Sequence, residues 1–295
     1  WALKTHAFFI AADDIHVSVC DHIHMVIVAQ LPRGLEQGVN ITDCSRMVMR
    51  MSTLASALLL RQAGVEPICQ MACRDRNRIA LQADLLGAQA LGIRNILALT
   101  GDPVKAGDQA AARSVFDLES VRLLRLIRQL NDGLDACDRP LPDQATTLFA
   151  GAAIDPQSRS WSGLQRRFEK KLEAGAQFFQ SQLIDDFERL EKFMAHVAVG
   201  CDRPVLAGIF LLKSAKNAQF INRNVPGVEI PEHIIQRLAQ AADPLHEGVC
   251  IAAEQVKAAR ELCQGVHVMA IRREDLIPKI LELAEVAPLS SLSPC

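Results

Sequence analysis

Short apolar runs alternate with longer helical stretches along almost the whole chain, and this alternation constrains the fold more than any other feature. Runs that are apolar throughout are typical of parallel strands covered on both faces. We expect eight such strands, at 7–12, 39–42, 66–71, 94–100, 147–152, 177–183, 204–210 and 265–270. A helical stretch follows each strand, the first at 17–30, and two extra helices at 231–241 and 243–263 precede the eighth strand.

Eight strand–helix units in 295 residues predict an α/β fold, a single (β/α)8 TIM-type barrel with extra helices before the eighth strand. We expect the barrel to span residues 1–287 and residues 288–295 to form a flexible tail. A doubly wound open sheet is the alternative, but its GxGxxG fingerprint is missing after the first strand.

Charge and composition exclude several classes of partner. The net charge is −2, aromatic residues make up 4% and tyrosine is absent, so binding of nucleic acid through a basic surface or stacking platforms is not expected. The apolar stretch 20–31 is too short and too polar to cross a membrane. The nine cysteines include no CxxC pair, which favours reduced, buried thiols in a cytoplasmic protein and no metal site.

Polar residues gather where the expected strands end, and barrel enzymes place their active sites at these ends. The candidates are Asp13 or Asp14, Thr42, Asp43, Gln70, Thr100, Gly101, Asp102, Asp155, Gln180, Gln182 and Asp185. Carboxylates and amides predominate, without a histidine or cysteine cluster. This set suits acid catalysis and hydrogen bonding to a heterocycle better than metal-dependent hydrolysis.

The segment Cys73–Asp102 is the most distinctive part of the sequence, and six further motifs support the same interpretation. They are VNITD (39–43), VFDL (115–118), KLEAG (171–175), QSQLIDD (180–186), GIFLLKSA (208–215) and VEIPE (228–232). Together they resemble the methylenetetrahydrofolate reductase family, in order, from about residue 38 to 285.

This resemblance implies a flavoenzyme that reduces 5,10-methylenetetrahydrofolate to 5-methyltetrahydrofolate by hydride transfer. It implies FAD as the cofactor and leaves FMN open. The substrate is a folate, and NADH, NADPH or a protein would supply the electrons. A homo-oligomer or a partner subunit also stays open.

The resemblance also assigns residues. Cofactor contacts carry over to Thr42, Asp43, Thr100, Gly101 and Asp102, and the cofactor phosphates to Arg167, Lys170 and Lys171. Gln70, Gly151 and Asp155 stand where some members have histidine, tyrosine and histidine at the cofactor. Asp102, Gln182 and Arg273 are the implied substrate contacts, with Gln182 at the pterin ring and Asp102 also stabilising charge during catalysis.

The family's general acid is a glutamate at the end of the first strand, and here we expect Asp13 in that role. Gln30 stands in a similar local string, but only eight residues separate it from Val39, too few for a helical crossover between parallel strands. Twenty-five residues separate Asp13 from Val39. Asp14 remains an alternative.

Two other functions remain open at this point. One is a flavin-binding barrel subunit of a larger one-carbon or electron-transfer complex, with reduced or no independent activity. The other is a pterin-binding methyltransferase barrel, which would bind no flavin.

Overall fold

The computed structural model describes residues 23–28, 37–45, 48–103, 107–109, 111–142, 145–225 and 227–286, with backbone alone for 23–28 and 37. The strand expected at 7–12, Asp13, Asp14, Gln30 and the tail at 288–295 lie outside these residues.

Seven parallel strands form a curled sheet, as the alternation predicts. They are β2 (Gln37–Ile41), β3 (Pro67–Ala72), β4 (Asn95–Leu99), β5 (Phe149–Ile154), β6 (Phe178–Leu183), β7 (Val205–Phe210) and β8 (Gly265–Met269). Each pairs with the next in parallel register. Their carboxyl ends therefore meet at one edge, which we call the mouth.

The first strand differs from the expectation. β1 (Ile23–Val28) lies inside the stretch 17–30 that we expected to be helical. It pairs antiparallel with both β2 and β8 and so joins the two edges of the parallel sheet. The strand order closes, but the ring is not the predicted barrel of eight parallel strands. The reason is that an antiparallel pair needs only a short connection. The eight residues between Gln30 and Val39 are too few for a helical crossover between parallel strands, but they suffice to join β1 to an antiparallel β2.

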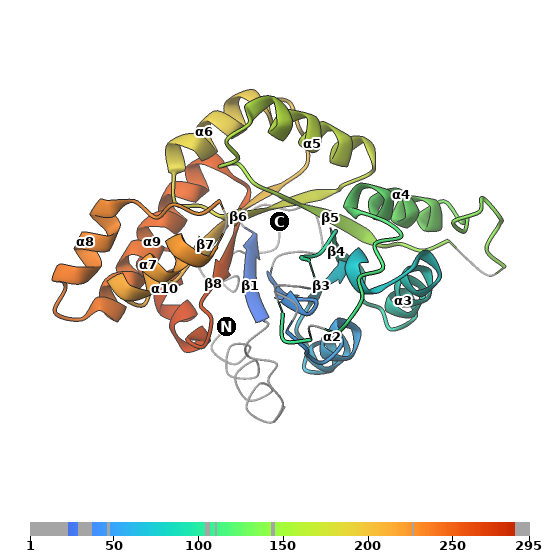
Figure 1. The fold of residues 1–295 in the computed structure, drawn as a ribbon, viewed down its shortest axis with the longest axis horizontal. Coiled ribbons are helices and arrows are strands. Elements are labelled where there is room, and N and C mark those ends of the chain that lie inside the picture. Colours follow the sequence, from blue (N-terminus) through green and yellow to red (C-terminus); the bar gives the residue numbers. More distant parts are fainter. Residues whose placement is uncertain are drawn as a thin grey trace, which may run out of the picture.

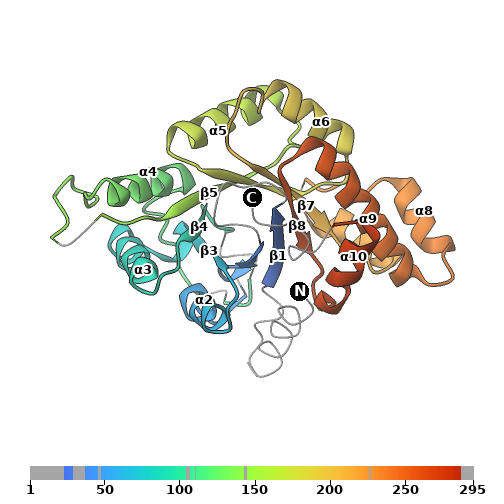
Figure 2. The ribbon, with the colours of Figure 1, turned by 180° about the vertical axis from the view of Figure 1, so that it is seen from behind.

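Helices surround the strands on the outside (Figures 1 and 2). They are α2 (Thr53–Gln62), α3 (Arg78–Ala90), α4 (Ser120–Asn131), α5 (Trp161–Glu173), α6 (Phe187–His196), α7 (Ala215–Asn224), α8 (Glu232–Gln240), α9 (Pro244–Leu262) and α10 (Ile277–Leu283). α8 and α9 are the two extra helices expected before the eighth strand. In the described part of the chain, no helix is both long and apolar enough to cross a membrane.

Polar residues mark where several of these helices begin. Ser52 accepts a hydrogen bond from Ala55 N at the start of α2, and Asn77 accepts from Ile79 N and Ala80 N at the start of α3. Such side chains satisfy backbone N–H groups that have no partner inside the helix.

Apolar side chains of the described residues form three clusters, of which one joins α7, α8 and α9 and the other two lie along the strands. The larger of these two fills the space between strands and helices. The smaller lies inside the ring and consists of Ile68, Leu97, Phe178 and Leu206, with Leu99 and Phe149 packed against it. Gly151 is required here, because a Cβ at this position would lie 2.1 Å from the Phe178 ring.

Seven cysteines lie in the described residues, and all are free thiols. Burial raises the pKa of Cys69, Cys73 and Cys263 to about 12, which keeps these thiols protonated and inert. Cys137 is exposed, contrary to the expectation of buried thiols.

Candidate active site

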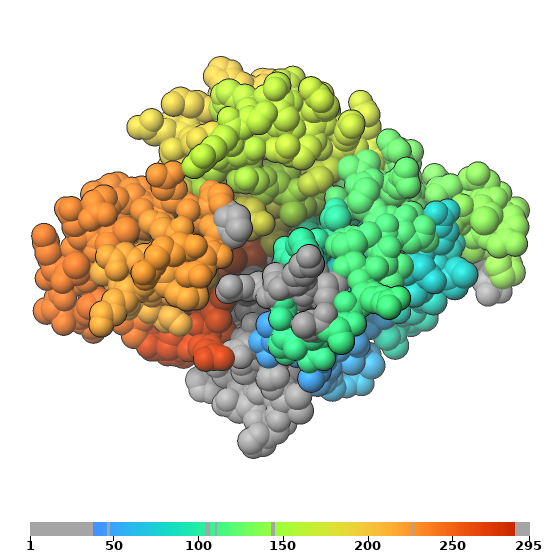
Figure 3. Space-filling view, in the orientation of Figure 1, coloured from blue at the N-terminus to red at the C-terminus, as the bar shows by residue number. Residues whose placement is uncertain are grey.

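The mouth brings together most of the residues that the sequence singled out. Thr42, Thr100 and Asp155 directly follow β2, β4 and β5, and Gln182 is the next-to-last residue of β6. The space-filling view shows this face hollowed between the green segment that leads to α4 and the orange region that contains α7 and α8 (Figure 3).

A cationic hollow of about 470 Å³ lies beside Thr100, between α4 and α5. Five of its side chains are basic: Arg122, Arg125, Arg167, Lys170 and Lys171. Glu119 is the single acid among the described residues of this lining, and its carboxylate accepts hydrogen bonds from Val121 N and Arg122 N at the start of α4. The hollow therefore suits a phosphorylated ligand.

A second hollow of about 200 Å³ adjoins the first and shares Arg167 and Lys171 with it. Asp155 and Gln182 also line it, so expected phosphate, cofactor and pterin contacts are neighbours. Burial raises the pKa of Asp155, against the hydrogen bond from Gln157 N. Burial lowers the pKa of Lys171, and the nearby charge of Arg167 adds to that effect.

Asp43 is tied into a network of ion pairs beside the mouth. Its Oδ2 accepts from Ala72 N at 2.8 Å and from Arg76 at 2.6 Å. Arg76 also pairs with Asp84 of α3 at 2.7 Å. Burial alone would lower the pKa of Arg76, but the two carboxylates raise it. Through these contacts the Asp43 carboxylate links α3 to the ends of β2 and β3.

The loop after β4 is held closely against the loop after β3. Gly101 has φ +94°, and a Cβ there would lie 2.8 Å from the Cβ of Arg74. The Arg74 side chain is 1% exposed and pairs with Asp75 at 2.6 Å. Thr100 Oγ1 accepts from Ser120 N at 3.1 Å, which joins the loop to α4. The close approach explains glycine at 101, and it leaves Asp102 exposed at the mouth.

Thr42 directly follows β2, Gln70 lies on the neighbouring β3, and the two side chains differ in their partners. The Thr42 hydroxyl is buried and has no hydrogen-bond partner within the described residues. Gln70 turns into the ring, where its Nε2 donates to Asn40 Oδ1 at 2.9 Å. A buried hydroxyl without a partner is costly unless something binds to it, so Thr42 is a position where a ligand fits.

Two further predicted residues are placed less favourably for ligand contact. Gly151 offers no side chain, and the Phe178 ring fills the space where one would stand. Arg273, in the loop after β8, pairs with Asp275 through two hydrogen bonds of 3.0 and 2.9 Å.

Sequence reasoning missed Asn40 and His267, which are buried inside the ring. Each is a single polar residue between apolar neighbours in a strand, Val39 and Ile41 for one, Val266 and Val268 for the other. This pattern could have revealed them, because an apolar strand interrupted by one polar residue predicts a buried hydrogen-bond partner.

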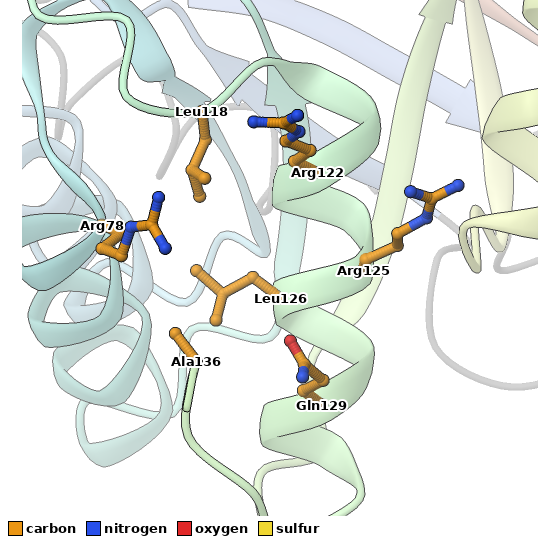
Figure 4. A pocket seen from close by; sticks show the side chains of 7 residues that line it. All are labelled: Arg78, Leu118, Arg122, Arg125, Leu126, Gln129 and Ala136. Atoms are coloured by element: carbon orange, nitrogen blue, oxygen red, sulfur yellow. The ribbon is translucent and has the colours of Figure 1, made fainter. Parts of the chain in front are cut away.

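A third hollow, of about 180 Å³, lies outside the ring between α3 and α4 (Figure 4). Leu118, Leu126 and Ala136 form its apolar part, and Arg78 reaches toward it from the start of α3. Arg78 is paired with Asp117 at 2.9 Å, an ion pair that lowers the pKa of the Asp117 carboxyl to about 2. This hollow is separate from the strand ends.

Comparison with known proteins agrees with the motifs. Residues 22–285 match the family model described as "Methylenetetrahydrofolate reductase". A probable methylenetetrahydrofolate reductase (NADPH) of Caenorhabditis elegans is 26% identical over 243 residues, 78% of this chain and 34% of that protein. Methylenetetrahydrofolate reductase 1 of Schizosaccharomyces pombe is 28% identical over 227 residues, 75% of this chain and 34% of that protein. The chain thus spans about a third of the length of these relatives.

Among solved structures, an uncharacterized protein from Clostridium thermocellum has a similar fold. Its TM-score is 0.58 at 15% identity, and the match covers 95% of this chain and 87% of that one. That protein binds two copies of 5-methyl-5,6,7,8-tetrahydrofolic acid.

Proposed function

Since the chain belongs to the methylenetetrahydrofolate reductase family, we propose that it reduces 5,10-methylenetetrahydrofolate to 5-methyltetrahydrofolate with a bound flavin. The observation that carries this proposal is the family match over residues 22–285, which includes every described strand. The folate bound by the similar C. thermocellum protein supports the substrate class.

The residues at the mouth fit a flavin nucleotide. Arg167, Lys170 and Lys171 would hold its phosphates, because they line a hollow with a strong excess of positive charge. Thr42, whose hydroxyl has no partner among the residues that the structure describes, and the Thr100–Asp102 loop would contact the ring system. The size and charge of the hollow favour the two phosphates of FAD, with FMN as the alternative. When bound, the flavin supplies hydride transfer.

On the substrate side, Gln182 would orient the pterin. Its side chain is exposed at the mouth, next to Asp155 and Lys171, and its amide offers paired donor and acceptor groups. Asp102 would stabilise positive charge that develops on the folate. Arg273 would contact the substrate only after leaving Asp275, so its role depends on rearrangement of the loop after β8.

Opening the folate's five-membered ring requires a proton on its leaving nitrogen, and Asp13 or Asp14 would donate it. Ile23 pairs with Ile41 at the carboxyl end of β2, so the chain enters β1 at the mouth. An aspartate needs a raised pKa to act as an acid at neutral pH.

The remaining assignments concern the whole protein. We propose a single barrel domain over residues 1–287, a cytoplasmic location, and NADPH, NADH or a protein as electron donor. The name of the C. elegans relative favours NADPH. A homo-oligomer or a partner subunit is compatible with this arrangement.

The decisive experiment separates the two half-reactions. Protein saturated with FAD is mixed anaerobically with NADPH or NADH, and flavin bleaching is followed at its visible absorption band. The reduced protein is then mixed with 5,10-methylenetetrahydrofolate, and recovery of the band together with 5-methyltetrahydrofolate is measured. Absence of folate reduction by a protein that binds and reduces flavin would contradict the proposed reaction.

A flavin-binding subunit with little activity of its own is the second candidate. Gln70 and Gly151 favour it, because one amide is engaged inside the ring and the other position has no side chain. Failure with nicotinamide donors but success with an artificial electron donor would support this candidate. Absence of any flavin binding would point to the methyltransferase instead.

A further inference from the structure

Four buried polar side chains form an unbroken hydrogen-bonded chain through the inside of the ring. Gln70 Nε2 donates to Asn40 Oδ1 at 2.9 Å, and Asn40 Nδ2 donates to Gln180 Oε1 at 2.6 Å. Gln180 Nε2 lies 3.0 Å from His267 Nδ1. We call these four residues, which come from β3, β2, β6 and β8, the polar belt. None is more than 9% exposed.

The belt has one end at the mouth. Asn40 pairs in register with Ile68, so Gln70 lies two residues closer to the strand ends. Continuing the same register beyond the pair Ile41–Cys69 places Thr42 beside Gln70. Since the Thr42 hydroxyl has no partner among described residues, this end of the belt adjoins a position suited to a ligand.

Every link of the belt has a direction. Each amide donates its NH2 group to the next residue, and the last amide donates to His267 Nδ1. An imidazole nitrogen that accepts carries no proton, so this direction requires the tautomer with its proton on Nε2. Gln70 then has its carbonyl oxygen outside the belt.

The reverse direction makes the same number of hydrogen bonds. Because an amide's nitrogen and oxygen have nearly the same shape, rotating each amide by half a turn changes only which atom donates. His267 Nδ1 would then donate to Gln180, Gln180 to Asn40, and Asn40 to the carbonyl of Gln70. The NH2 group of Gln70 would be the one left outside the belt.

We propose that the polar belt is a polarity relay, in which the tautomer of His267 and the donor or acceptor character of Gln70 are coupled. Gln70 is thus a positioning residue that can offer either a carbonyl or an amide N–H to a ring nitrogen. The identity of that ring rests on the proposed function: it is the flavin, which has an edge nitrogen that accepts a hydrogen bond in one redox state and donates one in the other. All four side chains are buried, and all three hydrogen bonds between them are formed. The two directions of the belt are therefore two separate states.

The relay predicts an effect at a distance. In Gln70→Glu the carboxylate can only accept, so Asn40 must turn its NH2 toward residue 70. Gln180 then turns its NH2 toward Asn40 and its oxygen toward His267, and Nδ1 acquires a proton. Asn40→Asp acts in the same way, because its carboxylate accepts from both neighbours.

The test is nitrogen-15 NMR of the histidine side chains in protein without added flavin, with His267→Asn used to identify the His267 signals. The wild type should show an unprotonated Nδ1, and both Gln70→Glu and Asn40→Asp should show a protonated one. Gln182→Glu is the control, since it adds the same charge at the mouth, outside the belt. Circular dichroism checks that each variant is folded.

Two results would overturn the relay: an unchanged Nδ1 in both folded belt variants, or a protonated Nδ1 in the Gln182→Glu control. The measurement needs no cofactor. A protein that fails to bind flavin would therefore contradict the proposed function without affecting the result for the belt.

Discussion

Lys171 and Ala153 join α5 to the last residues of β5, because Nζ of the lysine donates a 2.6 Å hydrogen bond to the carbonyl oxygen of the alanine. The bond holds one ammonium group where the cationic hollow and the Gln182 hollow meet. A single side chain thus contacts both proposed ligand positions while securing the helix to the sheet.

Lys171→Met should weaken flavin binding about 10- to 100-fold, since a hydrogen bond to a charged group contributes about 1.5–3 kcal/mol. Fluorescence titration with FAD and FMN measures the effect. Lys192→Met, which removes an exposed lysine paired with Glu188 on α6, should leave affinity unchanged. Equal losses in both variants would contradict a phosphate role for Lys171.

The affinity for flavin should also fall at alkaline pH. Burial lowers the pKa of Lys171, so as pH rises its positive charge is lost earlier than that of an ordinary lysine. Lys171→Arg should retain binding to higher pH, because a guanidinium stays protonated. Titrations of both proteins across pH 7–10.5 test this, and identical profiles would exclude Lys171 as the titrating group.

Gln182→Ala should raise the barrier for folate reduction by about 1–3 kcal/mol through loss of hydrogen bonds to the pterin. Reduction of the flavin by its donor should be nearly unaffected. Stopped-flow measurement of each half-reaction makes the comparison, with exposed Gln236→Ala on α8 as control. Equal damage to both half-reactions would indicate a disturbed site rather than lost pterin recognition.

Asp13→Asn should slow folate reduction by about 10²- to 10⁴-fold, the usual contribution of a positioned acid, and leave flavin reduction intact. Gln30→Ala should have a mild effect. If Asp13→Asn reduces folate at a near-normal rate, Asp14→Asn is the next variant. Asp155→Asn then follows, because burial raises the pKa of that carboxyl at the mouth.

Gly151→Ala should destabilise the fold by about 1–3 kcal/mol, the typical cost of overpacking a core, because the new methyl group would overlap the Phe178 ring. Urea denaturation measures this. Gly87→Ala in α3, where a Cβ meets nothing within 4 Å, should instead be stabilising. Adding Phe178→Leu to Gly151→Ala should restore part of the loss; no recovery would argue against the overlap as the cause.

The alternation of apolar and helical segments predicted β2–β8 to within a few residues, and a helix after each of them, because buried parallel strands have an unmistakable composition. It failed at β1. The run HMVIV has strand-like residues (24–28), but the prediction assumed that every strand runs the same way.

The sequence predicted the candidate site as a set of residue types at strand ends. It did not predict which side chains pair with one another there. Asp43 illustrates this, because its pairing with Arg76 links residues 33 positions apart. The belt shows the same limit: Asn40 and Gln180 are 140 positions apart, and only the closed strand order brings them together.

The reversed direction of β1 gives the ring a seam. β2 and β8 are its two neighbours, so a chain that lost this one strand would present two open rows of backbone N–H and C=O groups. Such edges pair readily with other chains. Six residues of antiparallel strand therefore separate a self-contained ring from a sheet able to join copies of itself end to end.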